Sequence, residues 1–198
     1  RGTKIFNRQQ FAAANGKRLA AIGLFFLGVF GVHADDLQTL EGLATRLARI
    51  EDARAIEYLQ NAYSYYVDRW QWDDAADLFA NEGTIELAQR GVYVGKPRVR
   101  QFLELFGPQG LHQGELFDHA LYQPVVHVAP DGLTAKARVR EFSMEGRYGV
   151  DAQIGGAIYE NEFVKEGGVW KIRSLHQYTT FVADLTRNRM SISWSPTE

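Results

Sequence analysis

The chain has 198 residues, no cysteine and a formal net charge of −2. The lack of cysteine excludes disulfide bonds, thiolate catalysis and cysteine-ligated zinc, and the charge provides no basic field for nucleic acid. Aromatic residues make up 13% of the sequence. This fraction suits a domain that encloses an apolar or aryl ligand, and it equally suits a small domain with bulky core residues.

The amino end of the sequence predicts an export signal. Lys17 and Arg18 precede the apolar run 19–32, which is too short to span a bilayer comfortably because about 20 apolar residues are needed. Val32 and Ala34 stand at the positions that a signal peptidase reads. We expect residues 1–34 to be a cleaved signal of an exported bacterial protein, periplasmic or secreted, with no stable membrane span after cleavage. A membrane anchor or a buried helix is the alternative interpretation.

An apolar stripe with helical spacing follows the predicted signal. It covers only about two heptads, so it predicts a helix that packs on the domain or on a partner helix rather than a long coiled coil. We expect a helical extension over residues 35–50 and a first domain helix over residues 51–67. The stripe consists of Leu37, Leu40, Leu43, Leu47 and Ile50, at steps of three and four.

Two shorter helices and a hairpin are expected next. One helix carries Trp72 and Phe79 on one face, and the Asn-Glu-Gly sequence at 81–83 ends it with turn chemistry. Residues 84–87 and 91–94 predict a short hairpin. A third helix begins at Lys96-Pro97 because proline is tolerated in the first turn.

The second half of the chain predicts strands. They cover residues 121–128, 134–146, 155–165 and 169–182, with turn sequences at 130–132 and 166–168. Helices followed by an antiparallel sheet indicate one α+β domain over residues 51–183, with a C-terminal tail over 184–198. A twisted sheet wrapped around the helices would leave a pocket on its concave face.

The chemically most informative residue of the first half is Asp68, which follows an aromatic-rich helix. A carboxylate that aromatic rings remove from water can take part in proton transfer. The alternative for Asp68 is a surface acid at the end of a helix, paired with Arg69.

Several residues of the strands could face the pocket. Strand alternation places His176 and Tyr178 on the side of Trp170, and a register change of one residue would reverse this assignment. Arg138 and Arg140 could hold a carboxylate or phenolate through forked hydrogen bonds, or they could form a solvated stripe or a subunit contact. No histidine and carboxylate cluster has metal-ligand spacing, and there is no phosphate or dinucleotide fingerprint. We therefore expect neither a metal nor an organic cofactor.

Four segments, in this order, resemble the SnoaL-like branch of the nuclear transport factor 2-like superfamily over about residues 51–181. The resemblance implies a cone-shaped α+β fold, with helices packed in the concave face of a curved mixed, mostly antiparallel sheet. It also implies a homodimer through the sheet face. The segments are IEDARAIEYLQNAYSYYVDRWQWDDAADLFANEGTIEL, GVYVGKPRVRQFL, FDHALYQPVV and YENEFVKEGGVWKIRSLHQY.

The same resemblance implies catalytic residues. Lyase members such as scytalone dehydratase and bile acid dehydratases have an aromatic residue and an acid at the end of the first helix. They also have a histidine at the start of a central strand. By position these residues are Tyr63, Asp68 and His119. An ideal helix separates Tyr63 from Asp68 by about 140°, so they converge only if the helix frays or turns, and Tyr65 is the alternative partner.

An Asp68–His119 pair could act as general acid and base, and a tyrosine could stabilise a developing oxyanion. The alternative for His119 is a surface histidine at a strand edge. We expect a cofactor-independent lyase of the dehydratase or retro-aldol/deformylase type, or an isomerase, that acts on a small apolar, aryl or polycyclic substrate. The alternative is a non-catalytic small-molecule-binding module. The expected substrate contacts are Tyr65, Trp72, Phe102, Arg138, Tyr159, His176 and Tyr178.

Overall fold

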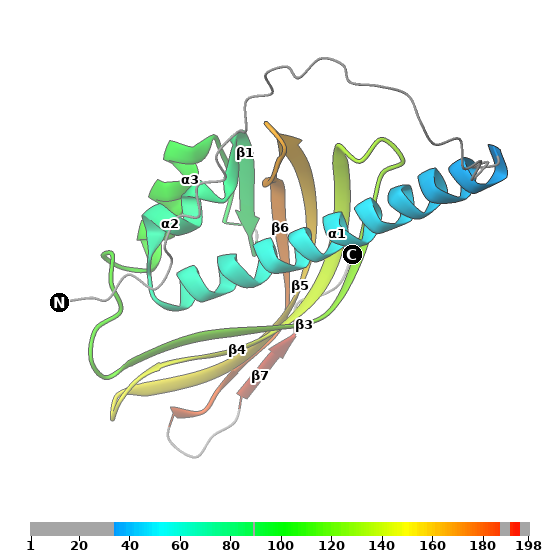
Figure 1. The fold of residues 1–198 in the computed structure, drawn as a ribbon. Coiled ribbons are helices and arrows are strands. Elements are labelled where there is room, and N and C mark those ends of the chain that lie inside the picture. The colour runs from blue at the N-terminus through cyan, green and yellow to red at the C-terminus, as the bar shows by residue number, and fades with distance from the viewer. Residues whose placement is uncertain (1–33, 89, 187–190, 195–198) are drawn as a thin grey trace.

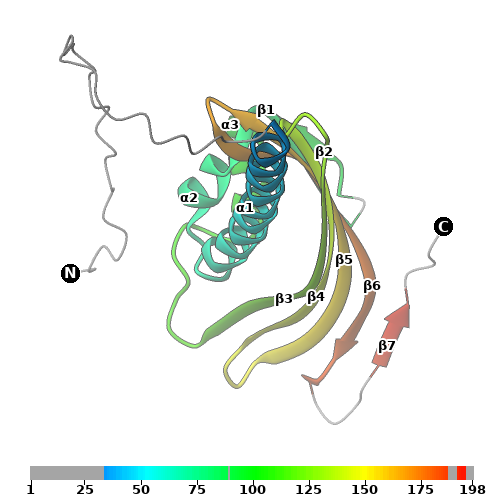
Figure 2. The ribbon, with the colours of Figure 1, turned by 45° about the vertical axis from the view of Figure 1, so that its right-hand side comes forward.

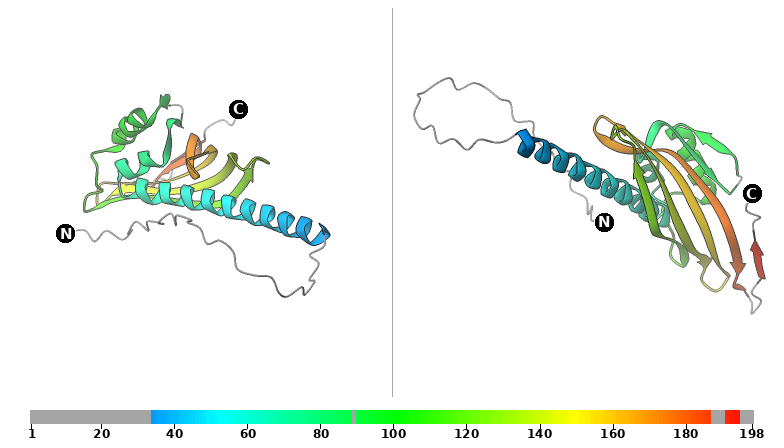
Figure 3. Two further views of the ribbon diagram at one scale, coloured as in Figure 1. Left: turned by 45° about the horizontal axis from the view of Figure 1, so that its top comes forward. Right: turned by 90° about the vertical axis from the view of Figure 1, so that its right-hand side faces the viewer.

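Helix α1 (Ala34–Asp68) is the longest element of the computed structural model, which describes residues 34–88, 90–186 and 191–194. The helix is continuous, so the predicted extension and the first domain helix are one element. Its C-terminal half lies across the concave side of the sheet, and its N-terminal half projects beyond the sheet (Figures 1 and 3). Apart from Ala34, the predicted export signal lies outside the described residues. None of the helices in the described ranges is both long and apolar enough for a membrane span.

The strands in the described part of the chain form one curved, mixed sheet of seven strands (Figure 2). The strand order is β2-β1-β6-β5-β4-β3, and β7 pairs with β6. Only the β1–β6 pair is parallel among the described pairings, which confirms the predicted α+β class. Part of the predicted tail over 184–198 joins the sheet as β7. The strands are β1 (Phe79–Leu87), β2 (Val92–Val94), β3 (Glu115–Val128), β4 (Thr134–Arg147), β5 (Asp151–Glu166), β6 (Val169–Asp184) and β7 (Ser191–Trp194).

Short helices stand with β1 and β2 beside the C-terminal end of α1. They are α2 (Trp72–Asp77), α3 (Lys96–Leu103) and the 3-10 helix η1 (Glu104–Phe106). The predicted turn at 81–83 is wrong, because these residues lie inside β1. Gly83 is buried, and a Cβ there would lie 2.8 Å from the carbonyl oxygen of Ile172. The glycine therefore permits a close approach of β6 rather than a turn.

The hydrophobic core lies between α1, the short helices and the concave face of the sheet. Trp72, Phe79 and Phe102 are fully buried in it, and burying a side chain of this size stabilises the fold by about 1.5–3 kcal/mol. The indole Nε1 of Trp72 donates a hydrogen bond to the carbonyl oxygen of Gly107 at 2.9 Å. Trp72 and Phe102 are therefore core residues, contrary to the prediction that they contact substrate.

Polar contacts hold α1 on the sheet and define where it ends. Asp52 accepts hydrogen bonds from Lys165 Nζ at 2.5 Å and from Trp170 Nε1 at 2.8 Å. At the other end Trp70 has a φ of 53°, in the left-handed region. The backbone N–H of Gln71 donates a hydrogen bond to the carbonyl oxygen of Tyr66 at 2.8 Å. This closure resembles a helix C-cap. It leaves Asp68 in the last turn, where β3 passes.

A β-bulge in β6 reverses one predicted face. Arg173 is an extra residue between two register pairs of the β5–β6 ladder, and one extra residue inverts the alternation beyond it. Trp170 and Ile172 are buried on the concave side, whereas His176 and Tyr178 lie on the convex side. The prediction that His176 and Tyr178 share the face of Trp170 is therefore wrong.

Candidate functional site

Helix α1 holds His119 of β3 through a set of hydrogen bonds. Asp68 Oδ1 accepts the His119 backbone N–H at 2.9 Å and lies 3.0 Å from the ring Nδ1. The Ser64 hydroxyl donates to the His119 carbonyl oxygen. The side chains of His119 and Asp68 are only 12% and 15% exposed. The structure thus brings Asp68 and His119 together and fixes the orientation of the imidazole.

A second carboxylate approaches the other side of the ring. Glu145 Oε1 lies 3.6 Å from His119 Nε2, and Gln153 Nε2 donates to Glu145 Oε2 at 2.9 Å. Burial lowers the pKa of His119, but the hydrogen bonds to Asp68 and Glu145 outweigh it and raise the pKa to about 10. Burial raises the pKa of Glu145, yet the contact with His119 prevails and lowers it. At neutral pH the ring is therefore an imidazolium between two carboxylates.

His119 lines a small cavity of about 140 Å³ on the concave face of the sheet. Tyr63, Tyr159 and Glu141 line the same cavity. Burial raises the pKa of Tyr63 and of Tyr159, and the charge of Glu141 acts in the same direction, so both phenols stay neutral hydrogen-bond donors. Asp68 is not among the lining residues and instead supports His119 from outside the cavity.

Glu141 is the unexpected acid of this cavity. Its side chain is 4% exposed, and Oε2 has no hydrogen-bond partner within the described part of the chain. Burial raises the pKa of Glu141, although the His119 cation and a hydrogen bond with Tyr159 oppose this effect. A buried carboxyl oxygen without a partner is costly, and it leaves one position where a ligand can bond.

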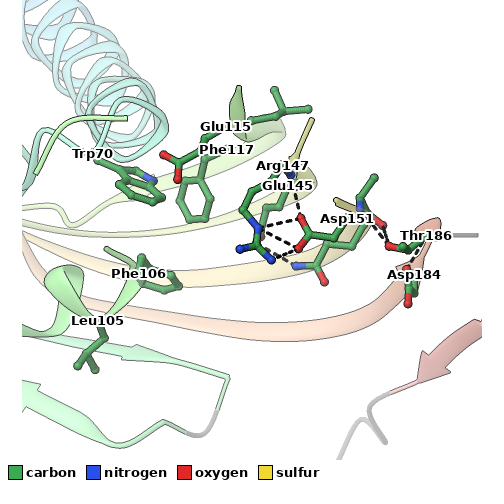
Figure 4. A pocket seen from close by; sticks show the side chains of 14 residues that line it. Trp70, Leu105, Phe106, Glu115, Phe117, Glu145, Arg147, Asp151, Asp184 and Thr186 are labelled. Atoms are coloured by element: carbon green, nitrogen blue, oxygen red, sulfur yellow. Dashed lines mark hydrogen bonds and ion pairs between the residues drawn. The ribbon is translucent and has the colours of Figure 1, made fainter. Parts of the chain in front are cut away.

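A larger cavity of about 560 Å³ adjoins the first one (Figure 4). The two cavities share a wall, in which Glu145 contacts the ring of His119. The other residues that line both cavities are Phe106, Phe117 and Gln153. Arg147 lies in the wall of the larger cavity, but its guanidinium is paired with Asp151, with Nε 3.0 Å from Oδ2. The outer cavity therefore offers an aromatic side, an ionised Glu145 and a neutralised cation.

Most of the predicted substrate contacts lie away from these cavities. Tyr159 lines the inner cavity, but Tyr65 is 72% exposed, because two residues from Tyr63 correspond to about 200° around the helix. Arg138 is exposed on the convex face and pairs with Glu160. His176 and Tyr178 stack on that face with ring centroids 4.1 Å apart. In the described ranges, no group of three or more histidine, aspartate or glutamate side chains could hold a metal ion.

Sequence reasoning missed Glu141 and Glu145, although a signal for them existed. Ala137 and Val139 are buried on β4, and alternation from them places residues 141, 143 and 145 on the same face. An acid at a core-facing strand position needs a compensating partner or a function. His119 is this partner for Glu145. One carboxyl oxygen of Glu141, Oε2, has no hydrogen-bond partner among the described residues.

The curved open sheet, with helices in its concavity and a polar cavity between them, defines an α+β protein of the nuclear transport factor 2-like type. Residues 48–176 match the profile of the SnoaL-like domain. This match covers more than half of the chain, and the chain therefore belongs to the SnoaL-like family.

Solved structures share the cone-shaped fold at low sequence identity. The hexachlorocyclohexane dehydrochlorinase LinA-type3 from Novosphingobium barchaimii LL02 is 18% identical, with a TM-score of 0.63 over 74% of this chain and 98% of that chain. A protein named as a candidate scytalone dehydratase from Novosphingobium aromaticivorans DSM 12444 is 22% identical, with a TM-score of 0.59 over 75% and 95%. No curated protein sequence matches this chain.

Proposed function

We propose that the protein is a cofactor-independent lyase or isomerase that works by acid/base chemistry on a small, uncharged, aryl-bearing substrate. One observation carries the proposal. The His119 imidazolium lies between the Asp68 and Glu145 carboxylates and lines a cavity with neutral phenols and a buried acid. Donors and acceptors of protons thus lie side by side in a largely buried site.

His119 and Glu145 supply the two proton transfers of an elimination. Glu145 is ionised and takes the proton from the substrate carbon. The Nε2–H of His119 gives its proton to the departing hydroxyl, so that the C–O bond breaks, a C=C bond forms and water leaves. The proton on Glu145 then returns to His119 across the 3.6 Å that separates Oε1 from Nε2. Asp68 holds Nδ1–H throughout and keeps the ring in position.

The neutral donors stabilise the oxygen on which negative charge develops. Tyr63 and Tyr159 keep their protons, because burial raises the pKa of both phenols. Burial raises the pKa of Glu141 and so favours its neutral form, and the unpartnered Oε2 can share a hydrogen bond with a carbonyl or phenolic oxygen of the substrate. A retro-aldol cleavage uses the same stabilisation, since breaking the C–C bond leaves an enolate on that oxygen.

The charges around the cavities favour an uncharged substrate. The carboxylates of Asp68 and Glu145 outnumber the single charge of His119, and the guanidinium of Arg147 is paired with Asp151. Arg90 also lines the inner cavity, so its guanidinium and the His119 imidazolium offset these two carboxylates and leave no net charge from these groups to bind an ionic substrate. The inner cavity suits the reacting group, and the aromatic side of the outer cavity suits an aryl substituent.

The test is turnover of a panel of neutral aryl β-hydroxy ketones and aryl 1,3-diols, followed by the absorbance of conjugated products and by formaldehyde release. We expect His119→Gln to lower kcat/KM by about 10²–10⁴-fold. Tyr63→Phe should lower kcat, whereas its matched control Tyr65→Phe should not, since Tyr65 is exposed on the other side of the helix. Unchanged turnover in both His119→Gln and Asp68→Asn would sink the proposal.

A non-catalytic binding module is the second candidate. Its supporting observation is that both ring nitrogens of His119 already face carboxylates, as in a fixed structural cluster. It predicts that calorimetry detects ligand binding without product, and that binding survives Asp68→Asn.

Homodimerisation through the convex face and export through residues 1–34 complete the proposal. Tyr122, Val125, Phe142 and Tyr178 are exposed apolar side chains, and their strands lie on or next to those of the Arg138–Glu160 pair. Val125→Glu should disrupt the contact through this face and lower the molecular mass of the assembly in sedimentation experiments. Sequencing the amino terminus of protein recovered from a bacterial periplasm tests export and cleavage.

A further inference from the structure

The projecting half of α1 carries large apolar side chains that its own domain leaves exposed. Leu40, Leu43, Leu47 and Ile50 are 60%, 52%, 56% and 61% exposed. At about 100° per residue, they fall within an arc of about 80° on the side of the helix opposite Ile56. Ile56 is fully buried against the domain. The stripe therefore lies on the side of the helix opposite the core, in the half of α1 that projects beyond the sheet (Figure 3).

The spacing of the stripe matches the seam of a two-stranded coiled coil. Steps of three, four and three residues place Leu40 and Leu47 at a positions, and Leu43 and Ile50 at d positions. Arg46 then occupies a g position and Glu51 the following e position. In a parallel pair of identical helices, these two positions of opposite chains face each other, once on each side of the seam.

The charges of Arg46 and Glu51 therefore favour a second copy of this helix in parallel orientation. A second copy of this helix, in parallel and in register, brings Arg46 next to Glu51 twice by symmetry. An antiparallel copy with the same four apolar residues in contact brings the two Arg46 side chains together instead, which is repulsive. The helix is already formed by its attachment to the domain, so pairing does not require a new helix nucleus.

We propose that residues 40–51 form a short parallel coiled coil with α1 of a second copy of this chain. The coiled coil joins two domains at the amino ends of their first helices and leaves both cavities outside the contact. This proposal rests on the helix surface and does not depend on the proposed reaction.

Single cysteines test the register, because the chain has no cysteine of its own. In the full chain, Leu47→Cys places two thiols opposite each other at the seam, and oxidation with copper phenanthroline should give a disulfide-linked dimer. The matched control is Thr45→Cys, which is two residues away and about 200° around the helix. Its thiol should not cross-link at the same rate.

Equal cross-linking of both variants, or none at Leu47→Cys, overturns the proposal. Cross-linking of Leu40→Cys with Ile50→Cys, without self-linking at Leu47→Cys, indicates an antiparallel pair and also overturns it.

Charge reversal tests the partner. In the Val125→Glu background, which removes the contact proposed for the convex face, Arg46→Glu and Glu51→Arg should each raise the dissociation constant of the dimer in analytical ultracentrifugation, and combining the two should restore it. A dimer whose dissociation constant stays the same in all three variants of this background is held by another surface and overturns the proposal. A full chain that stays monomeric at all concentrations overturns it as well, which includes the case in which a different protein covers the stripe.

Discussion

Replacing Asp68 by asparagine tests the charge that holds His119. The substitution keeps the size of the side chain and one acceptor oxygen, but it removes the negative charge. Asp68 Oδ1 serves the His119 backbone N–H at 2.9 Å and the ring Nδ1 at 3.0 Å. The amide can keep the backbone contact, so the fold should survive. The imidazolium loses its strongest neighbour, and the pKa of His119 should fall.

The size of the effect follows from how far the folded protein raises the pKa of His119. The pKa rises from 6.5 to about 10, which corresponds to roughly 5 kcal/mol at about 1.4 kcal/mol per pKa unit. Asp68 shares this effect with Glu145 and Glu141. A hydrogen bond to a charged group contributes about 1.5–3 kcal/mol. We therefore expect the variant to lower the pKa of His119 by about 1 to 2 and the stability by about 1.5–3 kcal/mol at pH 7.

The raised pKa of His119 also determines the direction in which folding stability changes with pH. A group whose pKa is raised on folding stabilises the fold fully below its unfolded pKa, here 6.5, and loses this contribution as the pH rises through about 10. The stability difference between the wild type and Asp68→Asn should therefore stay constant up to the pKa of His119 in the variant, about 8 to 9, and shrink as the pH rises from there through about 10. Denaturant titrations at several pH values measure it, and ¹⁵N spectra of the imidazole report the pKa of His119 directly. An unchanged pKa, or a difference independent of pH, refutes the reasoning.

Three other substitutions test the cavity and the core. Because burial raises the pKa of Glu141, wild-type stability relative to Glu141→Gln should fall as the pH rises above the unfolded pKa of about 4.5, which denaturant titrations can follow. Gly107→Ala would place a Cβ 2.3 Å from the Trp70 ring, at a φ of 152°, so thermal unfolding should show a loss of about 1–3 kcal/mol. Phe79→Ala empties a fully buried position and should cost about 3–5 kcal/mol in the same assay.

The order of elements could be predicted because its signals are local. The hairpin turns at 130–132 and 166–168 depend on glycines with positive φ at 132, 167 and 168, and such residues punctuate a sequence visibly. The pairing of Asp68 with His119 is different, since 51 residues separate them. Periodicity assigns a residue to a face of its own element but does not name its partner in another element. That pairing came from the family resemblance and not from spacing.

The acids of β4 show a second limit of local patterns. A glutamate in a strand is normally taken as a sign of the solvent side, because isolated buried carboxylates are costly. Glu141 and Glu145 break this rule, since an imidazolium from β3 lies between β4 and the end of α1. The two glutamates can be recognised as inward-facing only after Ala137 and Val139 have identified the buried face of β4.

The bulge at Arg173 decides which side chains of β6 the cavity receives. Residues on both sides of it alternate between the two faces, so the sequence agrees equally well with the register that has the bulge and the one that lacks it. The extra residue turns Gln177 and Thr179 toward the cavity and sends His176 and Tyr178 to the convex face. Among the described residues that line the cavity, His119 is therefore the one histidine. For the same reason, exchanging His176 should leave turnover unchanged even where exchanging His119 abolishes it.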